Sequence, residues 1–149
     1  MNLDYIRHIS RENPTDIETI LYAIYVHNTR AVPYADAIAS GLKPIETRTR
    51  DVLGRFVGKR VLIIRTEDGK KPMVIGSAFI RDKAFHDANT MDFLRDLTCI
   101  PPGSKYDCNG KGKWCYYMAH PVQFAEPIPL DEFKVISRTR SHATLSIPS

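Results

Sequence analysis

The chain has 149 residues, of which 43% are hydrophobic and 26% are charged, and its formal net charge is +4. This length suits one domain, and the composition is that of a globular protein, which excludes an intrinsically disordered chain. The chain opens with Met-Asn-Leu-Asp, in which Asn2 is polar and Asp4 is acidic, and no apolar run approaches the roughly 20 residues of a membrane-spanning helix. We therefore expect a cytoplasmic protein without a membrane partner.

The first part of the chain is predicted to be an arm that leads into a strand. Residues 15–21 have the capping pattern of a helix start, with Thr15 as the cap and Glu18 three residues later. Residues 22–26 are rich in aromatic and β-branched side chains and predict a strand over about residues 20–27. We assign residues 1–19 to an N-terminal arm or a short extra element.

A short helix is predicted next, directly before a polar strand. Pro33 suits the first turn of a helix, Asp36 suits its positive end, and Gly41 suits the left-handed residue that ends it. The segment Glu-Thr-Arg that follows reads as the start of a strand. Because side chains alternate along a strand, Glu46 and Arg48 are expected to face the same way.

The polar segment from Gly41 to Arg48 is the strongest candidate for a site. It brings the ammonium of Lys43, the carboxylate of Glu46 and the guanidinium of Arg48 into a short stretch. Arginine offers a planar fork of donors and lysine a point charge, a combination that suits a phosphate or the polar edge of a base. The alternative is a purely structural Glu–Arg pair on a strand.

The rest of the chain predicts further strands and one helix. The helix is expected over residues 90–97, with Asn89 or Thr90 as its cap. Residues 140–149 are expected to be a loose tail, so the domain is placed at residues 20–139. The fold class is α+β, a small mixed β-barrel of five to six strands with two or three short peripheral helices. The additional strands are expected at residues 61–65, 73–82, 114–125 and 133–139.

Two regions combine basic side chains with possible nucleic acid contacts. Residues 48–65 contain six arginines and lysines and a single acid, Asp51, so they can follow a phosphate backbone if one face holds most of them. The alternative is a solvated loop. Residues 105–117 place Trp114, Tyr116 and Tyr117 beside lysines, which permits base stacking, although such aromatics also close the core of a small barrel.

Metal and cofactor chemistry is not expected. Cys99, Cys108, Cys115 and His120 have the spacing C-x8-C-x6-C-x4-H, which lacks the close C-x2-C pairs of structural zinc sites. Three reduced thiols are the default, with a Cys108–Cys115 disulfide as an alternative. No glycine-rich phosphate loop or dinucleotide fingerprint occurs. His86 and His120 remain alternatives for an acid or base at the Lys43 and Glu46 site.

Several of these segments together resemble the ASCH domain (activating signal cointegrator homology) of the PUA-like superfamily. The resemblance covers residues 20–136 and implies a PUA-like β-barrel. The matching segments are Pro33-Tyr34-Ala35, Gly41-x-Lys43-x-x-Glu46-x-Arg48, Gly58-Lys59-Arg60-Val61-Leu62-Ile63, residues 74–80 and residues 121–130.

The resemblance also implies a ligand. ASCH domains are associated with binding of RNA or modified nucleotides in a cleft beside this motif, and relatives include ribonucleases and bacterial acetylcytidine amidohydrolases. Carried over, Lys43, Glu46 and Arg48 line the cleft, and Tyr34 lies near its wall. The amidohydrolase relatives have a threonine nucleophile where this chain has Glu46, and Pro44 replaces a threonine common after the lysine. A carboxylate cannot act as a hydroxyl nucleophile, so amidohydrolase chemistry is in doubt.

Two functions therefore stand beside each other. The first is binding of RNA or a modified nucleoside or nucleotide, without a cofactor. The second is a metal-independent hydrolase with Lys43 as oxyanion stabiliser and Glu46 or His86 as general base. A raised pKa of Glu46 would favour the hydrolase, whereas a fully ion-paired Glu46 would favour binding. A protein partner is a third alternative, and RNA and DNA are not distinguished. Lys43→Ala and Arg48→Ala are expected to weaken RNA binding without unfolding the domain. The expected binding residues are Tyr34, Lys43, Glu46, Arg48, Arg50, Arg55, Lys59 and Arg60.

Overall fold

The computed structural model describes Ile6 and residues 20–147. The arm or extra element expected over residues 1–19 therefore lies, apart from Ile6, outside the described residues, as do residues 15–19 of the possible helix start. Residues Ile20–His27 form a strand, which confirms the strand predicted there. None of the helices in the described ranges is long and apolar enough to cross a membrane.

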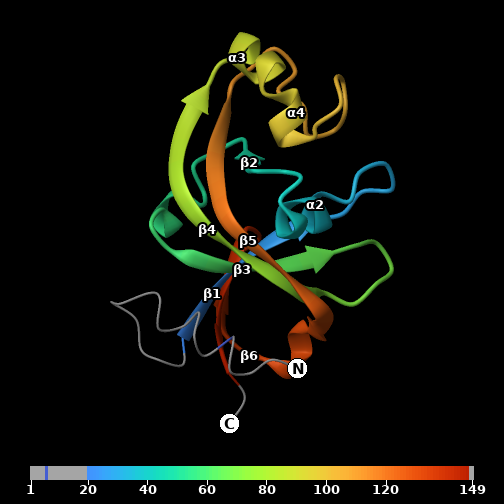
Figure 1. Cartoon of the computed structure of the whole chain (residues 1–149), viewed down its shortest axis with the longest axis vertical. Helices are drawn as coiled ribbons and strands as arrows, with labels where there is room; N and C mark the ends of the chain where they lie inside the picture. The colour runs from blue at the N-terminus through green and yellow to red at the C-terminus, as the bar shows by residue number, and fades with distance from the viewer. Residues whose placement is uncertain (1–5, 7–19, 148–149) are drawn as a thin grey trace.

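Seven strands form the body of the molecule within residues 20–147 (Figure 1). They are β1 (Ile20–His27), β2 (Ile45–Arg48), β3 (Arg60–Thr66), β4 (Met73–His86), β5 (Lys113–Pro129), β6 (Lys134–Arg138) and β7 (His142–Ser146). Three short α-helices and two 3-10 turns lie between them. These are α2 (Tyr34–Ser40), α3 (Ala88–Phe93), α4 (Arg95–Thr98), η1 (Gly54–Phe56) and η2 (Leu130–Glu132).

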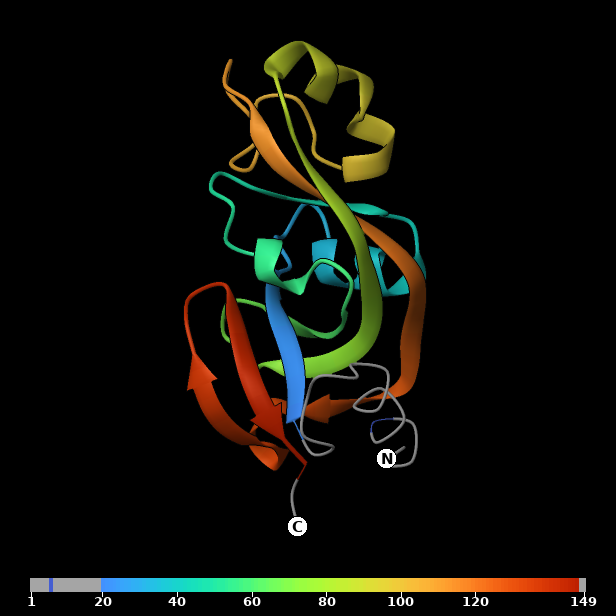
Figure 2. The same ribbon diagram turned by 90° about the vertical axis from the view of Figure 1, so that its left-hand side faces the viewer.

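The strands make one mixed sheet with the order β2-β5-β4-β3-β1-β7-β6. β1 and β3 run parallel, and the other neighbours run antiparallel. The two edge strands, β2 and β6, do not pair with each other, so the sheet is not closed. The long strands β4 and β5 nevertheless bend around the molecule and give it a barrel-like form (Figure 2). The expected α+β class is confirmed.

The loose tail expected over residues 140–149 is wrong for residues 142–146, which form β7. This strand pairs with β1, with Ala143 opposite Ala23 and Leu145 opposite Leu21, and it raises the strand count to seven. Ala143 and Leu145 are fully buried. The physical reason is a short alternation in His-Ala-Thr-Leu-Ser, which puts two apolar side chains on one face.

Two clusters of buried side chains cover the two faces of the central pair β1 and β3. Ile24 and Ile63 belong to one cluster, and Leu21 and Leu62 belong to the other. Strands buried on both faces are expected for a parallel pair in the middle of a sheet. Helix α2 packs onto the first cluster and thereby fixes the chain that leads into β2.

The helix predicted between Pro33 and Gly41 is confirmed as α2. It ends at Gly41, whose φ of 88° is the left-handed conformation that glycine adopts without strain. The helix predicted at residues 90–97 is instead two short helices, because the backbone at Leu94 leaves the helical region. The first begins earlier than expected, since Asp87 caps it by accepting a hydrogen bond from the Thr90 amide at 2.9 Å.

Candidate functional site

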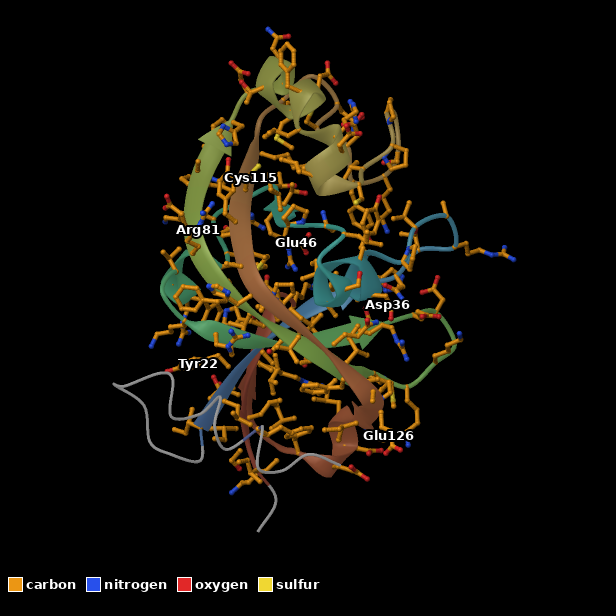
Figure 3. The ribbon with its side chains drawn as sticks, viewed as in Figure 1. Tyr22, Asp36, Glu46, Arg81, Cys115 and Glu126 are labelled. Carbon is orange, nitrogen blue, oxygen red and sulfur yellow. The ribbon has the colours of Figure 1, made fainter. Side chains whose placement is uncertain are left out.

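A cavity of about 250 Å³ opens where the C-terminal ends of β1 and β3 meet. Its walls come from β1, β2, β3, the first residue of α2, the segment between α4 and β5, and the turn between β6 and β7. Glu46, on β2, lies toward the middle of the molecule beside β5, whereas Arg81 lies on the outer edge of β4 (Figure 3). The cavity is lined by Tyr25, Val26, His27, Tyr34, Lys43, Glu46, Thr47, Arg48, Thr66, Ile100, Tyr106 and Arg140.

The ammonium of Lys43 is buried beneath the cavity, and the residue is only 1% exposed. Nζ donates hydrogen bonds to the backbone oxygens of Ile45 at 2.8 Å and Thr98 at 2.5 Å, and it lies 3.5 Å from Oε1 of Glu46. An ammonium has three donors, so the protein itself accounts for all of them. Burial lowers the pKa of Lys43, against the opposing effect of Glu46. We conclude that Lys43 supports the site from below.

The carboxylate of Glu46 is buried and held by two cations. Oε2 accepts a hydrogen bond from Nη2 of Arg48 at 3.0 Å, and Oε1 accepts one from the Thr47 amide at 3.0 Å. Burial by itself would raise the pKa of Glu46, but Arg48 and Lys43 outweigh it and lower that pKa below its ordinary value. Glu46 is therefore ionised at neutral pH and offers its remaining acceptor positions to the cavity.

Arg48 joins the edge strand β2 to β1 across the sheet's inner face. Its Nη2 also donates to the backbone oxygen of Tyr25 at 2.7 Å. Both hydrogen bonds that Arg48 makes to described residues use this one nitrogen. The side chain is 19% exposed, so the rest of the guanidinium fork is placed at the cavity rim.

Aromatic rings form the walls. The rings of Tyr34 and Tyr106 meet edge to face with 5.6 Å between their centroids, and Nζ of Lys43 lies 5.3 Å from the Tyr34 ring. His27 and Thr66 also line the cavity, and Nδ1 of His27 lies 2.8 Å from Oγ1 of Thr66. The cavity thus combines tyrosine rings, a fixed carboxylate and a partly free guanidinium.

Four of the sequence-predicted residues meet here, namely Tyr34, Lys43, Glu46 and Arg48. The other four do not line the cavity. Arg60 is 8% exposed and donates to Oγ of Ser77 and to the backbone oxygen of His120. The guanidinium of Arg55 and the ammonium of Lys59 lie over aromatic rings near β1, and Arg50 is exposed.

Eight of the twelve residues that line the cavity were not predicted from the sequence. Tyr25 and His27 were detectable, since they alternate at the end of a strand whose parallel neighbour ends at the same edge of the sheet. Tyr106 and Arg140 lie in loops, and no local sequence pattern predicts that they line the cavity. His86 and His120, the alternative acids or bases, are not among the lining residues; the ring of His86 instead contacts the hydroxyl of Tyr117 at 2.5 Å.

The three cysteines are unbridged. Cys115 is buried, and burial raises the pKa of its thiol to about 11, which makes it a poor nucleophile. No group of three His, Cys, Asp or Glu side chains that could hold a metal ion occurs among the described residues.

The segment that contributes Ile100 and Tyr106 is anchored by Asp107. This carboxylate accepts hydrogen bonds from the Gly103 amide at 2.7 Å, from Arg95 at 3.2 Å and from the Cys108 amide at 2.8 Å. The Gly103 bond is the main reason that the pKa of Asp107 falls to about 2. The anchor fixes the position of the Tyr106 wall.

We expect this anchor to titrate well below the range of an ordinary aspartate. Because the folded-state pKa is lowered, the stabilisation is complete above about pH 4 and is lost as the pH falls through about 2. The amide chemical shift of Gly103, followed by NMR, should show this titration, and Asp107→Asn should abolish it. A Gly103 midpoint near 4 in the parent protein would contradict the anchor.

Comparison with known proteins places this fold. No protein-family model matches the chain, and no curated protein sequence matches it. Three crystal structures of an ASCH protein from Zymomonas mobilis are similar to this chain, with TM-scores of 0.57, 0.55 and 0.54 at 22% sequence identity. Two of the three are structures of single-substitution variants. Each match covers 73% of this chain and 74–76% of the other. We conclude that this chain has the fold of ASCH domain proteins.

Proposed function

We propose that the cavity binds one base of a nucleotide-containing ligand, with RNA as the ligand we expect. The observation that supports this most directly is the carboxylate of Glu46, which is kept ionised between Lys43 and Arg48 in a cavity that two tyrosine rings also line. An ionised carboxylate accepts hydrogen bonds from the amino or imino groups of a base, and tyrosine rings pack against its faces.

The size of the cavity supports a single base. Its volume of about 250 Å³ is below the roughly 300 Å³ at which pockets for drug-sized ligands begin. The sugar and phosphate would then lie at the rim, where Arg48 and the exposed Arg140 are placed. Guanidinium groups suit phosphate oxygens.

The hydrolase alternative is less well supported. A general base works best when its pKa lies near the working pH, and the pKa of Glu46 is lowered instead. The donors of Lys43 are directed at two backbone oxygens and at Glu46, so none is left for an oxyanion. A bound ligand that stays intact is therefore the expected result.

The test is a metal-free incubation with labelled single-stranded RNA, analysed for both shift and cleavage. We expect a shift without cleavage. Glu46→Gln should weaken binding about 10- to 100-fold, since a hydrogen bond to a charged group contributes about 1.5–3 kcal/mol. Arg140→Ala should also weaken it, and Arg138→Ala, an exposed arginine outside the cavity lining, is the matched control.

Two results would contradict the proposal. Cleavage that Glu46→Gln abolishes would make the site catalytic. Equal binding by the parent and by Glu46→Gln, with both folded by circular dichroism, would place the ligand elsewhere.

A further inference from the structure

A row of side chains leads away from the cavity across three strands. Arg48 on β2 pairs with Trp114 on β5, and Trp114 pairs with Phe85 on β4. Residues paired in this way lie on the same face of a sheet. Neighbouring strands are about 4.8 Å apart, so the backbone at Phe85 is about 10 Å from the backbone at Arg48. The row begins at the cavity rim and ends near the tip of β4, next to α3 (Figure 1).

Phe85 is a large apolar side chain that is 54% exposed, yet its ring is held in place. One side meets Trp114 edge to face, with 5.7 Å between the ring centroids and an interplanar angle of 67°. Another side lies so close to Gly112 that a Cβ there would collide with the ring and would come within 2.6 Å of the His86 oxygen. Phe85 is therefore a fixed aromatic surface open to solvent.

Two lysines lie near this surface. Nζ of Lys83 lies 5.2 Å from the centre of the Trp114 ring and is held there by an ion pair with Asp51. Lys111 is exposed and directly precedes Gly112. Aromatic rings beside cations are the usual platform for bases of single-stranded nucleic acid, because every base has a π-face.

We propose that Phe85, backed by Trp114, stacks a base that flanks the one held in the cavity. This inference rests on the proposed function and makes its ligand more specific: a single-stranded nucleic acid segment, not a free nucleoside. The connecting phosphate would pass Arg48, whose guanidinium retains donors outside its Nη2 bonds. The continuity of the row with the cavity, together with the cations, favours this occupant over a protein partner.

Trp114 is the single tryptophan of the chain, so its fluorescence reports directly on this surface. The probes are the four RNA homotrinucleotides and the corresponding nucleoside monophosphates, titrated without metal at low salt. We expect the trinucleotide that binds best to quench Trp114 and to bind at least 10-fold more tightly than its monophosphate. The monophosphate, bound in the cavity alone, should leave Trp114 fluorescence nearly unchanged.

Phe85→Ala should reduce this preference. Loss of one stacked base is expected to weaken trinucleotide binding about 5- to 100-fold, while calorimetry should show the same monophosphate affinity as in the parent. Phe93→Ala is the matched control, because Phe93 is 90% exposed and lies on α3, which contributes no residue to the row.

The outcomes separate this inference from the function on which it rests. Tighter trinucleotide binding that Phe85→Ala removes would support both. Equal binding of mono- and trinucleotides, unchanged by Phe85→Ala, would overturn the stacking proposal but not the proposal that the cavity binds a base. A protein partner would then be the remaining explanation for the exposed Phe85 ring. No binding of either probe by the folded parent protein would overturn both.

Discussion

Replacing Lys43 with alanine should lower the free energy of unfolding by about 3 kcal/mol, the lower end of the range for breaking a buried ion pair. The substitution removes the donor to the backbone oxygens of Ile45 and Thr98, which are then left without that partner. It also leaves the buried carboxylate of Glu46 with one cation, Arg48, in place of two. Arg48 remains, which is why we expect a value near 3 and not 5 kcal/mol.

Urea denaturation at pH 7 is the measurement. Lys70→Ala is the control, since Lys70 is an exposed lysine whose surface pair with Glu67 should matter little. A second variant, Lys43→Met, keeps the volume of the stem and isolates the loss of the ammonium. Should Lys43→Ala and Lys70→Ala unfold at the same urea concentration, the ammonium of Lys43 would have no structural role.

This result would also revise an expectation drawn from the sequence. The motif suggested that Lys43 contacts the ligand and that its removal leaves folding intact. The sequence predicts that Lys43, Glu46 and Arg48 lie near one another, and all three line the same cavity. This proximity is predictable because strand alternation and the Gly41 helix stop are local features. The sequence does not reveal that Lys43 reaches the backbone of Thr98, 55 residues away. Such a contact depends on how α4 packs against β2.

The remaining differences have the same origin. Tyr106 and Arg140 enter the cavity from loops whose positions depend on partners farther along the chain. Arg95 donates to Asp107 beside Tyr106, and the Tyr25 amide donates to the backbone oxygen of Ser141 beside Arg140. The strand β7 is short, and its alternation was too brief to stand out in a polar tail. Long segments with a clear pattern, such as β3 and β4, were found, although β4 continues to His86, past the residue 82 predicted as its end.

A second large effect is expected for Gly76→Ala, which should destabilise the protein by about 3 kcal/mol or more. Gly76 is buried in β4, and a Cβ there would overlap the backbone oxygen of Val122 on β5 and lie 3.1 Å from Cβ of Ala39 on α2. Overpacking usually costs about 1–3 kcal/mol, and a backbone atom cannot move aside as a flexible side chain can. The register of β4 and β5 shifts on both sides of this close approach.

The substitution should also disturb the cavity, because α2 rests on Gly76 and supplies Tyr34. Urea denaturation gives the stability, and Gly69→Ala is a comparison with a different cause. Gly69 has a φ of 76°, whereas Gly76 is not left-handed, and no atom lies near the missing Cβ of Gly69. Gly69→Ala should therefore cost only the left-handed backbone penalty of about 1–2 kcal/mol. Adding Ala39→Gly to Gly76→Ala relieves the helix contact but not the overlap with Val122. The double variant should therefore regain little stability. Full recovery would show that the contact with α2, and not the overlap with β5, causes the destabilisation.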